Sequence, residues 1–353
     1  MYKLLRIILF KIDPEKAHNI AIKLLQYFPN FFTCLIENKE YKNLQQNIFS
    51  INFPNPIGMA AGFDKNAEII KALKQFGFGF IEVGTVTIKP QSGNEKPRIF
   101  RLEKDNAIIN RLGFNNKGCN YFEKNLDRDY NIVLGINIGK NKDSKDSIQD
   151  YTKLLEKFYN KASYITINIS SPNTKNLRDL QKQDQLEILV CEINKTRNLL
   201  EKNNNKRTPI FIKIAPDLDI EEQKSISEIA LKFKVDALII SNTTINRNFN
   251  LKSANSDESG GLSGKPLFAL SNEVLKNIYK FSDGKITLIA VGGIFCANDI
   301  YEKIKCGASL VQIYSCLIYQ GFGAVEKFKK DLSLLVEKDG FSNISQAIGL
   351  YHK

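Results

Sequence analysis

The segment Tyr164–Thr174, YITINISSPNT, shows the pattern that decides the fold. It begins as a short run of mostly apolar and β-branched residues, which predicts a strand buried on both faces. It then becomes a polar loop, and a helical pattern follows at residues 184–201. The same succession of buried strand, polar loop and helix recurs from residue 51 to residue 337.

Eight such units are predicted. The expected strands are residues 57–60, 80–83, 133–138, 164–169, 210–214, 237–240, 287–291 and 310–313. The expected helices are residues 66–76, 118–126, 149–160, 184–201, 220–233, 269–281, 297–305 and 324–336. A doubly wound open sheet could be built from such units, but eight in succession favour an α/β fold of the (β/α)8 (TIM) barrel type. We expect one barrel domain over residues 46–353 and a helical extension over residues 1–45.

The extension is rich in apolar residues and cations. Residues 4–10 are apolar apart from Arg6, and Lys3 and Lys11 flank them. Asp13-Pro14-Glu15 then provides an N-cap, a proline at the first helical position and an acid in the first turn, and further apolar residues follow as far as residue 36. This pattern predicts two short amphipathic helices, which either pack on the barrel or lie in a membrane interface. No apolar run is long enough to span a bilayer.

Composition excludes several classes of function. The formal net charge is +12, from 50 Lys and Arg against 38 Asp and Glu, but no dense basic run with interleaved aromatic residues exists. We therefore expect no nucleic-acid binding. The only histidines are His18 and His352, which argues against a Ser-His-Asp triad and a histidine-ligated metal. The six cysteines form no CxxC pair, so we expect no metal site.

Polar residues and glycines follow every predicted strand, at the end where a barrel has its active site. They occupy residues 61–65, 84–87, 139–141, 170–174, 215–217, 241–244, 292–293 and 314–315. An unpaired polar side chain in such a place costs roughly 1–3 kcal/mol. A polar ligand explains eight such strand ends better than chance does.

Glycines and asparagines indicate the kind of ligand. The glycine-rich loops Gly260–Gly264 and Gly292-Gly293 flank the seventh predicted strand, where barrels of this type bind phosphate, although both could be simple tight turns. Asn137 and Asn168 lie in predicted strands near the mouth. Further asparagines lie in the loops near the mouth, later in the chain. Several amides together suit a flat ligand with alternating C=O and N–H groups, although each asparagine alone could be a turn residue.

Two lysines and a serine are candidates for chemistry. Lys65 and Lys213 lie at strand ends in apolar surroundings, where an ammonium must face an anion or lose its charge. Lys213 could form a Schiff base, neutralise an anionic cofactor, or pair with a barrel carboxylate. Ser171 has no histidine nearby in the sequence, so it is no triad nucleophile. A preorganised serine can still accept a proton, or Ser171 could be only a turn residue.

Taken together, these motifs resemble dihydroorotate dehydrogenase, specifically its class 2, quinone-dependent branch. The matching stretches are collinear and cover nearly the whole chain, at residues 13–18, 60–65, 82–87, 96–102, 110–115, 135–141, 168–174, 213–217, 241–244, 260–266 and 312–315. The other branch of the family lacks the N-terminal helices and uses cysteine as its base. Ser171 stands at that position here, which favours class 2.

The resemblance implies a flavoprotein that oxidises (S)-dihydroorotate to orotate in pyrimidine biosynthesis, with FMN and a quinone acceptor. Ser171 would take the C5 proton while the C6 hydride goes to flavin N5, Lys65 would face the substrate carboxylate, and Lys213 would balance charge on the reduced flavin. The positions implied for FMN are Ala61, Gly62, Lys65, Thr85, Asn137, Asn168, Lys213, Ser241, Gly264, Gly293, Tyr314 and Ser315. Those implied for dihydroorotate are Lys65, Asn110, Arg111, Leu112, Gly113, Phe114, Asn168, Asn173, Asn242 and Thr243.

The resemblance also implies that the extension forms a quinone tunnel, with His18, Arg101 and Tyr314 in its lining, and contacts the membrane. We expect a monomeric peripheral protein on the cytoplasmic side of the cell inner membrane. Ser241 stands where the family often has threonine, and the hydroxyl is kept. The alternatives are a cofactor-free aldolase that uses Lys213, a membrane-associated binding module, and an FMN barrel that acts on another pyrimidine.

Overall fold

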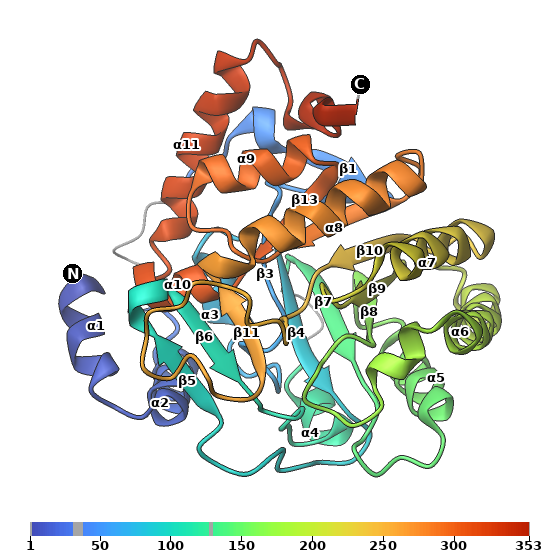
Figure 1. The fold of residues 1–353 in the computed structure, drawn as a ribbon. Coiled ribbons are helices and arrows are strands. Elements are labelled where there is room, and N and C mark those ends of the chain that lie inside the picture. The colour runs from blue at the N-terminus through green and yellow to red at the C-terminus, as the bar shows by residue number, and fades with distance from the viewer. Residues whose placement is uncertain (1, 31–37, 127–129, 353) are drawn as a thin grey trace.

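A closed barrel of eight parallel strands forms the centre of the computed structural model, which describes residues 2–30, 38–126 and 130–352 (Figure 1). The strands follow one another around the barrel in the order β10-β12-β13-β3-β4-β7-β8-β9. Their bounds are β3 (Ile57–Met59), β4 (Phe80–Val86), β7 (Val133–Ile138), β8 (Tyr164–Asn168), β9 (Ile210–Ile214), β10 (Ala237–Ile240), β12 (Thr287–Val291) and β13 (Ala308–Ile313). Each strand coincides with a predicted one, so the predicted (β/α)8 barrel is confirmed.

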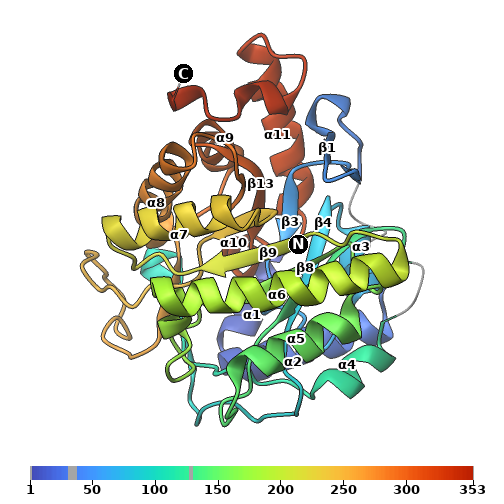
Figure 2. The ribbon, with the colours of Figure 1, turned by 90° about the vertical axis from the view of Figure 1, so that its right-hand side faces the viewer.

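Helices surround the barrel (Figures 1 and 2). They are α3 (Ile70–Gln75), α4 (Cys119–Lys124), α5 (Ser147–Phe158), α6 (Gln183–Asn204), α7 (Ile220–Lys232), α8 (Phe268–Phe281), α9 (Ala297–Lys305), α10 (Ser315–Gln320) and α11 (Ala324–Lys338). The helix predicted over 66–76 was placed too early, because it begins only at Ile70. The Asp64 carboxylate accepts the backbone N–H groups of Glu68 and Ile69, both at 2.9 Å, and Ala67 has φ 58°, which no helix accommodates.

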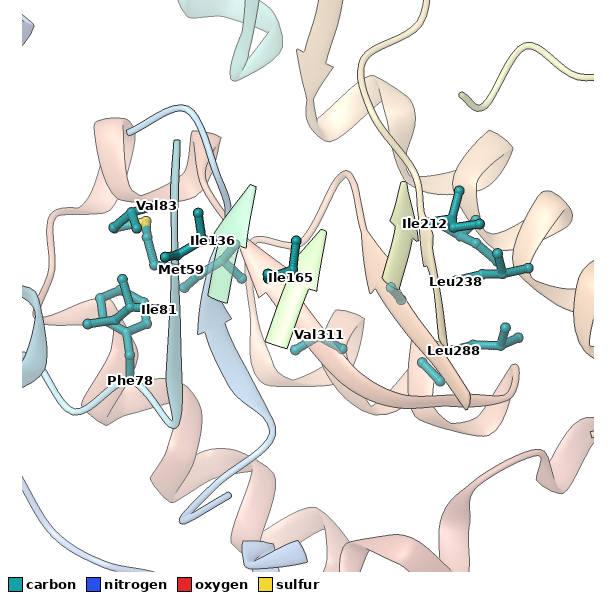
Figure 3. Close-up of a cluster of buried hydrophobic side chains, with 14 of the residues drawn as sticks. Met59, Phe78, Ile81, Val83, Ile136, Ile165, Ile212, Leu238, Leu288 and Val311 are labelled. Atoms are coloured by element: carbon teal, nitrogen blue, oxygen red, sulfur yellow. The ribbon is translucent and has the colours of Figure 1, made fainter. Parts of the chain in front are cut away.

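The strand side chains divide the core into two layers. Figure 3 shows residues that point outward from the barrel, such as Ile81 of β4 and Ile165 of β8, in the cluster that the helices cover. Neighbouring residues point inward, and Phe80, Tyr164 and Phe211 fill the barrel interior near the hairpin formed by β1 (Gln46–Ile48) and β2 (Ile51–Phe53). This end of the barrel is therefore closed by apolar side chains, and polar groups gather at the other end.

A second sheet, which was not predicted from the sequence, joins distant parts of the chain. It contains β5 (Ile99–Leu102), β6 (Ala107–Asn110) and β11 (Gly261–Gly264), antiparallel in the order β11-β6-β5 (Figure 1). The glycine-rich loop predicted at residues 260–264 is therefore largely a strand, and that prediction was wrong. Gly261 lies against the Thr243 side chain, since a Cβ there would be 1.9 Å from Oγ1, so glycine reports close packing here.

The N-terminal extension contains two helices, as predicted, α1 (Tyr2–Phe10) and α2 (Pro14–Tyr27). The Asp13 side chain caps α2 by accepting the Lys16 N–H at 2.9 Å. Ile7 and Ile8 of α1 are 56% and 62% exposed. Among the described residues, no helix is both long and apolar enough to cross a membrane. The apolar residues expected between 31 and 36 lie outside the described residues, and the boundary at residue 45 stays a prediction.

Candidate active site

A buried carboxylate lies beneath the polar end of the barrel. Glu82 of β4 has no exposed surface. Its Oε1 accepts the Asn137 side-chain amide at 2.7 Å, and its Oε2 accepts Tyr164 Oη and Thr166 Oγ1 at 3.1 Å and Gln312 Nε2 at 2.7 Å. Because the amide nitrogen of Asn137 is committed to Glu82, its oxygen faces the other way. No role was predicted for Glu82 from the sequence, although a charged residue inside an apolar strand is a signal that could have indicated one.

A row of hydrogen-bonded polar side chains runs across the barrel mouth above Glu82. Thr85 Oγ1 donates to Asn137 Oδ1 at 2.6 Å, and Asn168 Nδ2 donates to both, at 3.0 and 3.1 Å. Asn168 Oδ1 accepts Ser170 Oγ at 2.8 Å, and Asn242 Nδ2 donates to Ser170 Oγ at 2.9 Å. Strands β4, β7 and β8 and the loop after β10 thus bring these predicted residues together, and Ser170 is an addition to them.

The loop after β8 places Ser171 next to the second sheet. Ser171 is buried, and its Oγ accepts the backbone N–H of Asn173 at 3.3 Å. Asn173 Nδ2 donates to Asn110 Oδ1, at the end of β6, at 3.2 Å. Thr243 donates its backbone N–H to Asn242 Oδ1 at 2.8 Å. The predicted base and predicted substrate residues of three segments therefore form one cluster.

Two lysines carry positive charge at this end of the barrel. Lys213 of β9 is paired in register with Asn168 of β8, and its side chain makes no hydrogen bond or ion pair with any residue that the structure describes. Burial lowers the pKa of Lys213, and the charge of Glu82 opposes that shift. Burial also lowers the pKa of Lys65, to about 8, against the opposing effect of Glu15. Both ammonium groups are therefore suited to an anionic ligand.

Glycine backbone lines another part of the mouth. Gly62 follows β3 and Gly293 follows β12, and both have positive φ, 102° and 74°. A Cβ on Gly293 would lie 2.4 Å from the Cα of Phe268, at the start of α8. Gly264 ends β11, with φ 102°. The remaining predicted cofactor residues lie beside these elements: Ala61 after β3, Ser241 after β10, and Tyr314 and Ser315 after β13.

The predicted substrate stretch 110–114 follows β6. The Arg111 guanidinium is held by Glu258 and Phe100, since Nη1 donates to Glu258 Oε2 at 2.6 Å and the group lies 4.6 Å from the Phe100 ring centroid. The flanking residues are held by main-chain contacts, such as the Leu112 carbonyl, which accepts the Asn94 N–H at 3.0 Å. Gly113 and Phe114 both have positive φ, 70° and 53°.

Aromatic rings connect α2 to the barrel. His18 lies edge-on to Phe63, with ring centroids 5.1 Å apart, and Phe63 contacts Tyr314 at 5.9 Å. Burial, with the charge of Lys65, lowers the pKa of His18 to about 3, so this imidazole is neutral near pH 7. Burial raises the pKa of Tyr314 to about 12.

The third predicted quinone residue lies beside α1. The Arg101 guanidinium, from β5, is 4.6 Å from the ring centroid of Phe10 and donates to the Ile12 carbonyl at 2.9 Å. Arg101 thus holds the end of α1 against the second sheet. His18 and Tyr314, in contrast, both contact the Phe63 ring.

Known proteins identify the family. The family model described as dihydroorotate dehydrogenase matches residues 43–336. The chain belongs to the dihydroorotate dehydrogenase family. Relatives named dihydroorotate dehydrogenase (quinone) include those of Agrobacterium fabrum, 46% identical over 95% of this chain and 92% of the relative, and Xanthobacter autotrophicus, 42% identical over 99% of both. A crystal structure of the Eimeria tenella enzyme in complex with ferulenol has a TM-score of 0.92 and 40% identity, and covers 97% of this chain and 96% of that one.

The dihydroorotate dehydrogenase family is flavin-dependent, and the residues at the barrel mouth fit a flavin nucleotide. The row from Thr85 to Asn168 offers hydrogen-bonding groups to the edge of a flat ring. Lys213 supplies an ammonium without an ion-pair partner among the described residues. At Gly293 a Cβ would meet the start of α8, so the glycine packs its backbone close to a helix N-terminus, which is a group suited to a phosphate.

Proposed function

We propose that this protein oxidises dihydroorotate to orotate, with FMN as its cofactor and a quinone as its electron acceptor, in pyrimidine biosynthesis. The observation that carries the proposal is the buried row of Thr85, Asn137 and Asn168 beside the unpaired ammonium of Lys213. The names of the relatives support the same reaction. A Schiff-base aldolase is less favoured, because the surrounding amides and glycine backbone fit a large planar ligand with a phosphate.

Bound FMN would supply a hydride acceptor for the substrate and a relay of electrons to quinone. Lys213 provides a cationic group in register with Asn168, and Glu82 fixes the orientation of the Asn137 amide by accepting its Nδ2. The backbone at Gly264 and Gly293 would hold the phosphate. The full set that would hold the cofactor is Ala61, Gly62, Lys65, Thr85, Asn137, Asn168, Lys213, Ser241, Gly264, Gly293, Tyr314 and Ser315.

Ser171 acts as the base that removes the C5 proton of dihydroorotate. Its Oγ accepts the Asn173 N–H, so that N–H stabilises negative charge on the oxygen as the hydroxyl proton passes to solvent water and Oγ takes the C5 proton in its place. Lys65 binds the substrate carboxylate while its ammonium is protonated. The amides of Asn110, Asn173 and Asn242 orient the ring, together with Asn168, Thr243 and the backbone of residues 111–114.

The extension brings quinone to the site from a membrane. Exposed apolar residues of α1 and the flanking Lys3 and Lys11 suit an interface that contains anionic lipid. His18 and Tyr314 line the quinone path through their contacts with Phe63, and Arg101 lines it near α1. The protein is then a monomeric peripheral protein on the cytoplasmic side of the inner membrane.

Cofactor analysis tests this proposal. The purified protein is expected to be yellow, and acid extraction should release FMN, rather than FAD, at about one per chain. Colourless protein that cannot be reconstituted with FMN would contradict the proposal. Borohydride trapping of a substrate on Lys213 would instead indicate an aldolase, and vesicle binding without any redox activity would indicate a binding module.

A further inference from the structure

A buried ion pair joins α2 to the segment that precedes β5. Glu15 is 8% exposed and Arg98 is 5% exposed. Arg98 Nη2 donates to Glu15 Oε1 at 2.7 Å, and Nε donates to Oε2 at 3.0 Å, so the contact is bidentate. Glu15 lies in the first turn of α2, one turn before His18, which the proposed function places beside the quinone. The pair therefore anchors the helix of the quinone side.

The remaining nitrogen of the same guanidinium, Nη1, contacts the segment that leads to the proposed substrate residues. Arg98 Nη1 donates to the carbonyls of Ser92 and Asn94 at 2.7 and 2.6 Å. Asn94 Nδ2 then donates to the carbonyl of Arg111 at 3.0 Å and to that of Asn173 at 3.1 Å. Asn173 is the residue whose backbone N–H reaches Ser171 Oγ. One continuous set of hydrogen bonds thus runs from α2 to the loop that carries the proposed base.

The pair also acts on Lys65 through charge. Glu15 favours the protonated form of Lys65 and Arg98 opposes it. Lys96 adds a third cation, with Nζ 3.5 Å from Glu15 Oε1, but its side chain is 65% exposed, so solvent screens it. Glu15 and Arg98 therefore affect both the charge environment of Lys65, the proposed partner of the substrate carboxylate, and the position of Ser171, the proposed base.

We propose that Glu15 and Arg98 are positioning residues through which the seating of α2 controls binding of dihydroorotate. This inference rests on the proposed function. When α2 is seated, Arg98 is held, Asn94 is held by Arg98, and the backbone of residues 111 and 173 takes up the geometry that the substrate needs. When α2 moves, the backbone of residues 111 and 173 loses this support and departs from the geometry that binds the substrate. The quinone side and the substrate side are thereby coupled.

The test uses the holoenzyme without quinone. Flavin bleaching is followed after anaerobic mixing with dihydroorotate, and the apparent Kd and the limiting rate are obtained separately. Orotate affinity is measured from the flavin absorbance change. The variants are Glu15→Gln, Asn94→Ala and the double variant. The control is Tyr2→Phe, which removes an anchor of α1, the hydrogen bond from Tyr2 Oη to the Ile318 carbonyl at 2.6 Å, without touching the segment 92–98.

Each single variant is expected to raise the apparent Kd for dihydroorotate and for orotate by roughly tenfold, and the double variant by no more than the worse single one, because both interrupt one path. Tyr2→Phe should match the wild type. Wild-type affinities in both single variants, with only thermal stability or quinone turnover reduced, would overturn the inference, as would additive effects. If Glu15→Gln does not fold, Asn94→Ala alone decides, since Asn94 is partly exposed. Failure of dihydroorotate to reduce the wild type would instead refute the proposed function.

Discussion

At the residue scale, Ser171 is the residue on which the proposed chemistry depends. Serine is a poor base near neutral pH, and the Asn173 N–H is the one stabilising contact that the described structure provides to its oxygen. We predict that Ser171→Ala lowers the limiting rate of flavin reduction by about 10²- to 10⁴-fold, the usual contribution of a general base. Orotate affinity should change little, because the amides and Lys65 are kept. Rapid-mixing absorbance with dihydroorotate measures the rate, and an orotate titration measures the affinity.

A matched variant and a pH profile sharpen that prediction. Ser171→Cys supplies a more acidic group at the same position and should keep more of the rate than Ser171→Ala does. The wild-type limiting rate should rise with pH between 6 and 9, since loss of the serine proton becomes easier. A pH-independent rate in the isolated half-reaction, or full reduction by Ser171→Ala, would show that another group is the base.

Lys65 predicts a pH dependence of ligand binding with the opposite sign. Its ammonium has a pKa of about 8, so it is mostly protonated below that pH and mostly neutral above it. Orotate affinity should therefore be constant up to about pH 8 and then weaken, by up to about tenfold per pH unit. Lys65→Arg, which stays charged, should lose this decline. Parallel orotate titrations from pH 6.5 to 10 measure both proteins, and identical profiles would contradict the assignment of Lys65 to the carboxylate.

Single residues also show where prediction from the sequence stops. The strand-end positions of Asn137, Asn168 and Lys213 could be predicted, because a polar residue in an apolar run is conspicuous. The role of Glu82 could have been suspected on the same ground. Arg98 could not, since its partner Glu15 lies 83 residues away and neither residue stands in a patterned element of the barrel. A contact between distant segments is a property of the folded chain.

At the element scale, α1 presents an apolar surface without a partner in the described structure. Ile7 and Ile8 are 56% and 62% exposed, and burying one such side chain contributes about 1.5–3 kcal/mol. We predict that the double variant Ile7→Glu/Ile8→Glu weakens binding to vesicles that contain anionic lipid by at least tenfold. Flotation measures this binding. Reduction of the flavin by dihydroorotate should be unchanged.

The matched control is Leu199→Glu on α6. Leu199 is an aliphatic residue that is 65% exposed, so it is comparable with Ile7 and Ile8 but lies on another helix. Its vesicle binding should equal that of the wild type. Equal loss in both variants would show that α1 is not the membrane-contacting element.

The turn from β12 into the glycine pair gives a further prediction. A Cβ at Gly293 would lie 2.4 Å from the Cα of Phe268, so Gly293→Ala forces the start of α8 to move. Overpacking of this kind costs about 1–3 kcal/mol, which we expect to appear as a roughly 5- to 150-fold weaker FMN affinity. Gly340→Ala is the control, because Gly340 has a similar φ of 78° and nothing lies within 4 Å of its Cβ position. Equilibrium dialysis of FMN with the apoproteins distinguishes the two.

The elements differ in how well the sequence predicts them. The barrel strands could be predicted because each is a short apolar run between turn residues. Strand β11 could not, because Gly261–Gly264 contains one large apolar residue and gains its hydrogen bonds from β6, far away in the chain. Its glycines were predicted to form a loop, whereas residues 261–264 form a strand in which Gly261 packs against Thr243 and Gly264 packs against the backbone near Asn106.

At the scale of the whole molecule, the barrel has one apolar end and one polar end. Phe80, Tyr164 and Phe211 close the end near the β1–β2 hairpin, so ligands have access from the opposite end. There, the β6 end of the second sheet lies beside the loop that carries Ser171, the proposed substrate side, whereas β5 carries Arg101 against the end of α1, on the proposed quinone side. This arrangement predicts that substrate and quinone reach the flavin by different paths.

An anaerobic titration of the holoenzyme tests this account most directly. One equivalent of dihydroorotate per flavin is expected to bleach the flavin and to yield orotate. One equivalent of a short-chain quinone, added next, should restore the oxidised spectrum, whereas NAD⁺ or fumarate should not. A flavin that dihydroorotate leaves oxidised, or a reduced flavin that the quinone leaves reduced, would contradict the account.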